Sequence, residues 1–554
     1  MHICHPWLYS SSSASTTEPE TPTSFSTESP STSPDALPST KVISHPSPYQ
    51  HIKMRISPRS KCVTPVRAPL TCNLQLLFRI FAVEKLRQAV FFSLSSQTSL
   101  ICMLVRLRVK NILSYGAESE ICFIPYKRLK SHLNHIAEKG ERPLDILRYT
   151  AIYGANGAGK SNLLHALELC IEALRSCQVD NLWRNRNLLI PQEETQEIQI
   201  EFAPQGDSFT YTYGLSLREG VVEEEYLSKQ RFRKDGNPSD RREQTLLDRK
   251  REDAIYQYEV PAFDQMKNGE VYQSDVIPNL VKPNEISLGH IAKLDKEELS
   301  GIQNAYEWLT KKIQIITPNI YNMLWTVNLR NDDKYRKFYN TLISKFDTGI
   351  TQLQTVDLPL DKAAPPDFLS AIKEKLDKSP VYAFRSSANE VPRTFVKNSE
   401  GEIVSLSVLS EHRASDDAPV VPFDFNMESD GTLRLVDILA MVYEMLEMDT
   451  VFLVDEIESS LHPLLIKKVL KWLMSRDDVK GQLIFTTHNP ILLSSDLLRR
   501  DEIWFVEKRG ANAKLYSLSD YCQEHKSIDI AKGYLSGRYG AIPFLGELDG
   551  LKWR

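Results

Sequence analysis

The pattern of apolar positions predicts a strand, a loop and a helix between residues 151 and 175. Ala151-Ile152-Tyr153 is a short apolar run, typical of the end of a buried strand. Apolar residues then recur with helical spacing over Ser161–Arg175, at Leu163, Leu167, Ile171 and Leu174. The intervening residues are rich in glycine, so the chain is expected to turn tightly from the strand into the helix.

Two later apolar runs predict further buried strands. Val451–Val454 is followed by Asp455 and Glu456, and Leu483–Thr487 is followed by His488. Unbroken runs of this kind are typical of strands buried on both faces of a parallel sheet, whose carboxyl ends bind ligands. Helical spacing also predicts two helices, one with Leu465, Val469, Trp472 and Leu473 on one face, the other with Leu435, Leu439, Val442 and Leu446.

Alternating apolar and polar residues predict antiparallel strands on both sides of the glycine-rich turn. Met103–Val109 alternates as a half-buried strand does, and Ile198–Phe202 and Thr210–Leu217 alternate on either side of a turn at Gln205-Gly206-Asp207. These segments form a predicted block over residues 103–228.

The middle of the chain, residues 229–404, is interpreted as a largely helical insertion, with Leu299–Ile316 and Lys334–Phe346 as its clearest helices. Lys229–Asp253 is highly charged, and it is either a solvated helix or arm, or a face that contacts nucleic acid. Residues 405–554 return to strands and helices, so the expected fold class is α/β, with a mostly parallel central sheet, N-terminal antiparallel strands and this insertion.

Residues 1–102 form a separate Ser/Thr/Pro-rich stretch that we expect to be disordered. The stretch has no basic start followed by an apolar core, so it does not resemble a signal peptide. Gln88–Val105 is uncharged over a membrane-spanning length, but its serines, threonine and glutamine argue against a membrane helix. Either Met1 or Met103 is the functional start, since the organised pattern begins at Met103.

Composition narrows the class of protein. Over 554 residues, 42% are hydrophobic and 25% charged, which fits a soluble globular chain of several domains. The net charge of -5 does not indicate a protein that binds nucleic acid through its overall charge, although a local basic face is compatible with it. Eight cysteines without a C-x-x-C pair argue against zinc or a disulfide framework and favour a reducing, cytoplasmic location.

Chemistry enters with the glycine-rich loop, which matches the phosphate-binding pattern G-x-x-x-x-G-K-[ST] without a deviation. Backbone N–H groups of such a loop, and the N-terminus of the helix after it, point at a polyphosphate. We expect Lys160 to reach the β- and γ-phosphates and the Ser161 hydroxyl to bind Mg²⁺. The predicted nucleotide-binding residues here are Gly154, Ala155, Asn156, Gly157, Ala158, Gly159, Lys160, Ser161 and Asn162.

The polar residues at the strand ends are the candidates for hydrolysis. We expect Asp455 to hold Mg²⁺, directly or through water, and Glu456 to orient the attacking water. The imidazole of His488 would donate a hydrogen bond to the γ-phosphate. Lys160, Glu456 and His488 are therefore the predicted catalytic residues, with ATP and Mg²⁺ as cofactors.

A helix start in the second half is a further candidate phosphate site. Ser429 is a good N-cap, and with Gly431 it exposes N–H groups that suit an anion. An ordinary helix cap explains Ser429 equally well.

Together these elements resemble the ABC-type ATPase heads of SMC, RecF and overcoming-lysogenization-defect (OLD) proteins, and more closely the stand-alone bacterial AAA-domain ATPases of that class. The resemblance implies that the α/β fold is that of a P-loop NTPase, ABC-ATPase-like. In this resemblance Gly154–Ser161 is the Walker A loop, Val451–Glu456 is the Walker B strand and His488 is the switch histidine. Ser459–His462 takes the place of the D-loop, and Glu428–Leu435 that of the signature motif.

The two ends of the organised region also resemble the family. Leu107–Tyr115 is similar to its first strand, and Tyr534–Phe544 looks family-like, although no role can be assigned to it. Two departures matter: Asp430 stands where the signature usually has a second small residue, and the Q-loop glutamine is either Gln192 or Gln196.

The resemblance implies a homodimer in which each chain gives its signature serine to the ATP of the other. ATP would then close the dimer and hydrolysis would open it. The expected role is a conformational switch in DNA maintenance or in anti-phage defence, with DNA as a partner. The alternatives are a regulator of a separately encoded nuclease or toxin effector, a transporter subunit, which the missing usual signature disfavours, and a scaffold that binds nucleotide without hydrolysing it.

Overall fold

The computed structural model describes residues 103–543, apart from 138–143, 205–208, 232–242, 319–324, 361–365, 385–392, 416 and 522–528. The disorder predicted for residues 1–102 and the turn predicted at 205–207 lie outside the described residues. All described residues belong to one compact unit, Leu70–Arg554.

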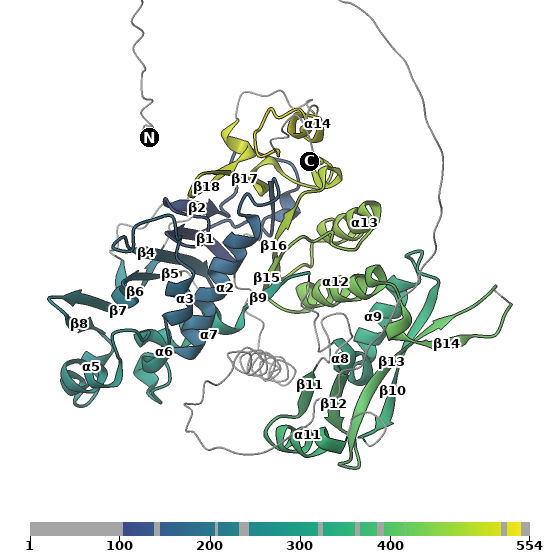
Figure 1. Ribbon diagram of the computed structural model, residues 1–554, viewed down its shortest axis with the longest axis horizontal. Coiled ribbons are helices and arrows are strands. Elements are labelled where there is room, and N and C mark those ends of the chain that lie inside the picture. The colour runs from purple at the N-terminus through teal and green to yellow at the C-terminus, as the bar shows by residue number, and fades with distance from the viewer. Residues whose placement is uncertain are drawn as a thin grey trace, which may run out of the picture. The chain divides into compact units, whose positions relative to one another are not determined.

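A six-stranded sheet forms the centre of this unit (Figure 1). Its order is β18-β17-β3-β16-β15-β9, and all neighbours are parallel except the β17–β18 pair. The strands are β3 (Tyr149–Gly154), β9 (Ile313–Ile316), β15 (Val451–Val454), β16 (Gln482–Thr487), β17 (Ile503–Arg509) and β18 (Asn512–Ser517). Every residue of β3, β15 and β16 is buried, which confirms the strands predicted from unbroken apolar runs.

A seven-stranded antiparallel sheet holds the N-terminal strands, in the order β2-β1-β4-β5-β6-β7-β8. Its strands are β1 (Met103–Lys110), β2 (Ser119–Cys122), β4 (Gln196–Ala203), β5 (Phe209–Arg218), β6 (Val221–Arg231), β7 (Gln244–Glu252) and β8 (Ile255–Glu259). The pairing of β4 with β5 confirms the predicted hairpin, and β1 confirms the alternating strand at Met103.

A third, five-stranded antiparallel sheet lies within residues 350–424. Its strands are β10 (Ile350–Pro359), β11 (Val381–Phe384), β12 (Arg393–Lys397), β13 (Ile403–His412) and β14 (Val421–Asp424). The helix α11 (Pro366–Lys378) packs on β12 through Ile372, Leu376 and Phe395. The middle of the chain therefore contains strands as well as the predicted helices.

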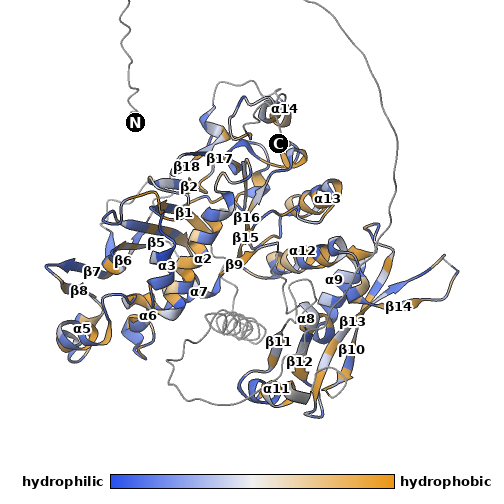
Figure 2. Cartoon of the chain, in the orientation of Figure 1, coloured by the Kyte–Doolittle hydropathy of each residue, from blue (hydrophilic) through white to orange (hydrophobic). Residues whose placement is uncertain are grey.

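The central sheet separates two hydrophobic cores. Ile152, Leu453 and Ile484 pack with the seven-stranded sheet and α2 (Lys160–Ser176), whereas Phe452 and Phe485 pack with α12 (Asp430–Glu447) and α13 (Pro463–Met474). Alternate residues of a strand point to opposite faces, so each strand supplies both cores. Figure 2 shows the hydrophobic residues along α12 and α13.

The helices confirm most of the sequence prediction. Those at 161–175, 430–447 and 463–474 occur where helical spacing predicted them. The remaining α-helices are α3 (Asp180–Arg184), α4 (Gly269–Val271), α5 (Ile277–Leu280), α6 (Ser287–Ile291), α7 (Ser300–Lys311), α8 (Trp325–Asn331), α9 (Asp333–Ile343) and α14 (Ile530–Leu535).

The predicted helix Leu299–Ile316 is wrong at its C-terminal end. Helix α7 stops at Lys311, and the isoleucine-rich residues after it form β9, which pairs in parallel with β15. Isoleucine favours strands because its branched side chain packs well on a pleated surface. A strand of the central sheet therefore comes from within the stretch 229–404.

The helix alternative for Lys229–Asp253 is also wrong in the described part of that stretch. Residues 244–252 form β7, whose basic side chains pair with acidic residues of β6. Lys250 lies 3.5 Å from Glu224, and Arg251 lies 2.8 Å from Glu223. Cross-strand ion pairs of this kind stabilise an antiparallel pair of strands, and here each basic side chain has an acidic partner within the sheet.

Among the residues that the structure describes, no helix combines the length and the apolar character that crossing a bilayer requires.

Candidate functional site

The glycine-rich loop joins the carboxyl end of β3 to the N-terminus of α2. Gly157 and Gly159 have φ angles of 74° and 114°, in the region that L side chains rarely adopt. A Cβ atom on Gly159 would lie 2.6 Å from Ser114 Oγ, and one on Gly154 would lie 2.6 Å from the carbonyl oxygen of Val506. Glycine is therefore required both for the turn and for close packing of the loop.

The segment after β1 holds the end of this loop. The buried Tyr115 hydroxyl donates a hydrogen bond of 2.9 Å to the carbonyl oxygen of Gly159. The carbonyl oxygen of Ser114 accepts a bond from the main-chain N–H of Ala513 in β18. This gives the family-like stretch Leu107–Tyr115 a structural role: it ties the phosphate loop to both sheets.

Lys160 is folded back onto the loop. Its Nζ donates to the carbonyl oxygens of Gly154, at 2.8 Å, and Ala155, at 3.2 Å. Burial lowers the pKa of Lys160, and the carboxylates of Glu456, Asp455 and Glu458 act in the opposite direction. The three carboxylates are therefore close enough to Lys160 to favour its charged ammonium form.

Asp455 and Glu456 follow β15 directly and reach the loop through a hydroxyl network. Ser161 Oγ donates to Asp455 Oδ1 over 3.0 Å, and Thr486 Oγ1 donates to the same oxygen over 2.5 Å. Thr486 Oγ1 also accepts the main-chain N–H of Glu456 over 2.8 Å. Glu456 has a φ of 45°, so the backbone turns sharply after the strand.

The residues that would hold Mg²⁺ fit that ion. The structure brings the Ser161 hydroxyl and the Asp455 carboxylate together, and hard oxygen ligands of this kind suit Mg²⁺ when phosphates complete the shell. Ser161 is also exposed, as a ligand shared with a nucleotide must be.

His488 follows β16 at the same edge of the sheet. Its main-chain N–H donates to Glu458 Oε1 over 2.9 Å, and its ring Nδ1 lies 3.3 Å from that oxygen. The ring is 54% exposed, whereas the Glu458 side chain is 8% exposed. Parallel strands end at one edge, which is why residues far apart in sequence converge here.

Ser429 and Gly431 lie at the start of α12. Ser429 Oγ accepts the main-chain N–H of Thr432 over 3.2 Å, which confirms the predicted N-cap. A Cβ atom on Gly431 would lie 2.8 Å from the carbonyl oxygen of Ser460, so this helix start packs against the segment Ser459–His462. In the described structure, Ser429 forms hydrogen bonds with Thr432 of its own helix. The phosphate loop is instead connected to Asp455, through the hydroxyl of Ser161.

The two candidate Q-loop glutamines differ in environment. Gln196 is buried in β4, and its Nε2 donates to the carbonyl oxygen of Leu182 over 2.9 Å. Gln192 is exposed. Which of them faces the nucleotide stays a prediction.

The C-terminal segment packs behind the loop. Tyr534 of α14 contacts the ring of Tyr153, the residue before Gly154, at a centroid distance of 5.8 Å, and it stacks on Phe505 at 5.7 Å. The Tyr534 hydroxyl donates to the carbonyl oxygen of Ala541. The stretch Tyr534–Phe544, for which the sequence indicated no role, thus supports the strand that leads into the loop, as far as its described residues show.

Sequence reasoning missed Thr486 and Glu458. Thr486 lies in the predicted strand Leu483–Thr487, and Glu458 lies between the Walker B and D-loop stretches. Neither residue stands at a spacing that marks it as part of a site. The signal that points to Thr486 is its place at the end of a strand adjacent to β15, which is known only once strand order is known.

Comparison with protein families identifies the chain's class. The model of a family described as "AAA domain, putative AbiEii toxin, Type IV TA system" matches residues 149–274 and 309–494, more than half of the chain. The chain belongs to this AAA-domain family. The match includes the phosphate loop, both strand ends with their polar residues, and the start of α12. The predicted resemblance to AAA-domain ATPases is confirmed.

The solved structures that match the chain include SMC heads. The SMC head domain from Thermotoga maritima and an SMC head bound to the C-winged helix domain of ScpA each show 13% identity and a TM-score of 0.33, with 75% of this chain covered, and 98% and 97% of theirs. No curated protein matches the chain.

Proposed function

We propose that this AAA-domain protein binds ATP at Gly154–Ser161 and hydrolyses it with the help of Mg²⁺. The observation that supports this most strongly is the convergence of Lys160, Ser161, Asp455 and Glu456 at one edge of the central sheet. When bound, Mg²⁺ would neutralise developing charge on the phosphates, and Ser161 and Asp455 would hold it.

In this proposal the chain's own groups divide the work. Lys160 leaves the carbonyl oxygens of Gly154 and Ala155 to bind the β- and γ-phosphates. Glu456 accepts a proton from, or orients, the attacking water, since its carboxylate follows the strand that places Asp455. His488 donates a hydrogen bond to the γ-phosphate and so distinguishes ATP from ADP.

The proposal includes a homodimer with ATP at the interface. Ser429 is exposed and Gly431 is partly buried, and the N–H groups of this helix start would donate hydrogen bonds to the γ-phosphate bound by a second chain. Asp430, also exposed, would have to point away from that phosphate. ATP would then favour the closed dimer, and hydrolysis would release it.

The biological role that we propose is a cytoplasmic switch in anti-phage defence or DNA maintenance. The family description, which names a putative toxin of a toxin–antitoxin system, supports the defence context. The described basic residues of β7 pair with β6, so DNA binding, if direct, would use other surfaces. Turnover measured with and without duplex DNA, at several salt concentrations, tests the DNA link: no stimulation and no salt-dependent binding would contradict it.

Replacing Glu456 by Gln tests the proposed reaction. The variant should bind ATP as the parent chain does, because the amide keeps the shape of the carboxylate, but turnover should fall by about 100-fold or more, the range general-base catalysis supplies. Steady-state phosphate release and ATP binding are measured on both proteins. Unchanged turnover would contradict the role of Glu456, and absent ATP binding would contradict the proposal as a whole.

A further inference from the structure

A third carboxylate, Glu458, lies in the turn that follows β15. The turn is tight: Ser459 donates its main-chain N–H to the carbonyl oxygen of Glu456 over 2.8 Å, and Leu461 donates to that of Glu458 over 2.9 Å. Glu456 and Ser460 have φ angles of 45° and 61°. This backbone turns the Glu458 side chain inward, where it is 8% exposed, while Ser460 remains on the surface.

Glu458 contacts the switch histidine twice. Its Oε1 accepts the main-chain N–H of His488 over 2.9 Å and lies 3.3 Å from the ring Nδ1. One carboxylate oxygen thus fixes both the backbone at the end of β16 and the side of the ring that faces inward. The other ring nitrogen, Nε2, is left for the nucleotide.

The second oxygen of Glu458 makes the carboxylate costly for stability alone. Oε2 is buried and finds no hydrogen-bond donor among the residues that the structure describes. A buried acceptor without a donor destabilises the fold, so a purely structural turn would hold the His488 main-chain N–H at lower cost with a single acceptor oxygen. Oε1 is the oxygen that faces the ring of His488, so the carboxylate is placed where it can orient that ring.

We propose that Glu458 is the positioning residue of His488, and that it orients the imidazole so that Nε2 reaches the γ-phosphate. This inference rests on the proposed ATP site and adds a residue to it. Partners that hold a ligating or reacting histidine by its other nitrogen set its orientation, and their loss typically costs about 10–100-fold in affinity or activity.

The test compares the binding of a slowly hydrolysed ATP analogue with the binding of ADP in the full chain. Glu458→Ala and His488→Ala should each lower the affinity for the analogue by about 10-fold and change the affinity for ADP by less than about two-fold, because only the triphosphate has the γ-phosphate. The double variant should lose no more than either single variant, since both remove the same interaction. Glu458→Gln, which keeps an acceptor oxygen, should restore most of the affinity.

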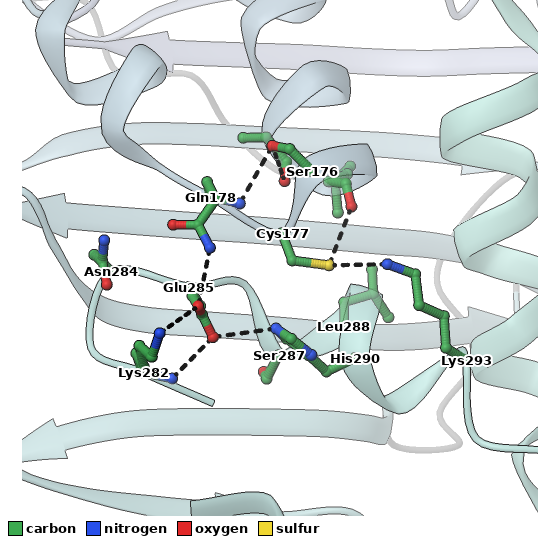
Figure 3. A network of polar contacts seen from close by, with 12 residues as sticks. Ser176, Cys177, Gln178, Lys282, Asn284, Glu285, Ser287, Leu288, His290 and Lys293 are labelled. Carbon is green, nitrogen blue, oxygen red and sulfur yellow. Dashed lines mark hydrogen bonds and ion pairs between the residues drawn. The ribbon is translucent and has the colours of Figure 1, made fainter. Parts of the chain in front are cut away.

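A matched control is available in Glu285. Its side chain is also 8% exposed, and it accepts hydrogen bonds from Gln178 Nε2 and the main-chain N–H of Lys282 in a network away from the strand ends (Figure 3). Glu285→Ala should leave the ratio of analogue to ADP affinity unchanged. Thermal unfolding monitors the folding of each variant, and Glu458→Met, which keeps the volume without acceptor oxygens, replaces an alanine variant that does not fold.

Two outcomes would overturn the inference. Losses that multiply in the double variant would mean that Glu458 and His488 act independently, and an unchanged analogue-to-ADP ratio in Glu458→Ala would mean that Glu458 does not orient the ring. Failure of the unmodified chain to bind either nucleotide would instead overturn the proposed function, so the two failures are distinguishable.

Discussion

Thr486 shows how one hydroxyl connects two residues of the proposed site. Its Oγ1 donates to Asp455 and accepts the main-chain N–H of Glu456, while its own backbone belongs to β16. The hydroxyl therefore fixes the carboxylate expected to hold Mg²⁺ and the backbone of the residue expected to orient water. Loss of a side chain that holds a metal ligand in place typically lowers metal affinity or activity by about 10–100-fold.

Replacing Thr486 by Val removes this hydroxyl at nearly constant volume. We expect the Mg²⁺ concentration for half-maximal ATP turnover to rise by about 10-fold, as losses of such supporting groups typically give. A Mg²⁺ titration of turnover measures the change. Thr487→Val is the control: Thr487 Oγ1 accepts only the N–H of Asn489 in the described structure, so its loss should leave the Mg²⁺ dependence unchanged. An equal effect from both variants would contradict the role of Thr486.

At the scale of elements, periodicity and motif spacing predicted the helices, strands and loop whose conformation depends on local sequence. The helices at 161–175 and 430–447 and the strand at 451–454 follow from apolar spacing, and the glycine loop follows from its eight-residue pattern. The same reasoning failed at β9, because the apolar residues of α7 and β9 form one continuous helical pattern. Only the neighbouring strand β15 decides that residues 313–316 extend rather than coil.

The parts of the site that sequence did not indicate depend on strand order. Thr486 and Asp455 are brought together because β16 and β15 are neighbours, and Glu458 meets His488 for the same reason. Tyr115, which follows a strand of the seven-stranded sheet, donates a hydrogen bond to Gly159, which follows a strand of the central sheet. These contacts are tertiary, and short-range patterns contain no information about them.

The place of β9 in the central sheet gives a test of the element assignment. Ile313 is 3% exposed, so Ile313→Ala should lower the free energy of unfolding by about 2–5 kcal/mol, the usual cost of truncating a buried isoleucine. Ile255→Ala is the control, since Ile255 is 70% exposed and its loss should change stability by less than about 0.5 kcal/mol. Denaturant unfolding measures both. A small effect at Ile313 would mean that β9 is not part of the cooperative core.

At the scale of the whole molecule, the central sheet lies between two hydrophobic cores. The carboxyl ends of its parallel strands lie at one edge of the sheet. The phosphate loop enters α2, which packs in one core, while α12 and α13 pack in the other. The start of α12 is exposed at Ser429 and packs at Gly431 on Ser460, which lies in the turn that follows Asp455 and Glu456. In the proposed function, this exposed helix start would complete the nucleotide site of a second chain.

The most direct measurement of this account mixes two inactive chains. Lys160→Ala removes the phosphate-loop lysine, and Ser429→Arg blocks the helix start, so each homodimer should hydrolyse little ATP. In a mixed dimer one site combines an intact loop from one chain with an intact helix start from the other. Random pairing then predicts recovery of up to about a quarter of the parent rate. No recovery on mixing, or full activity of Ser429→Arg alone, would contradict a site completed by a second chain.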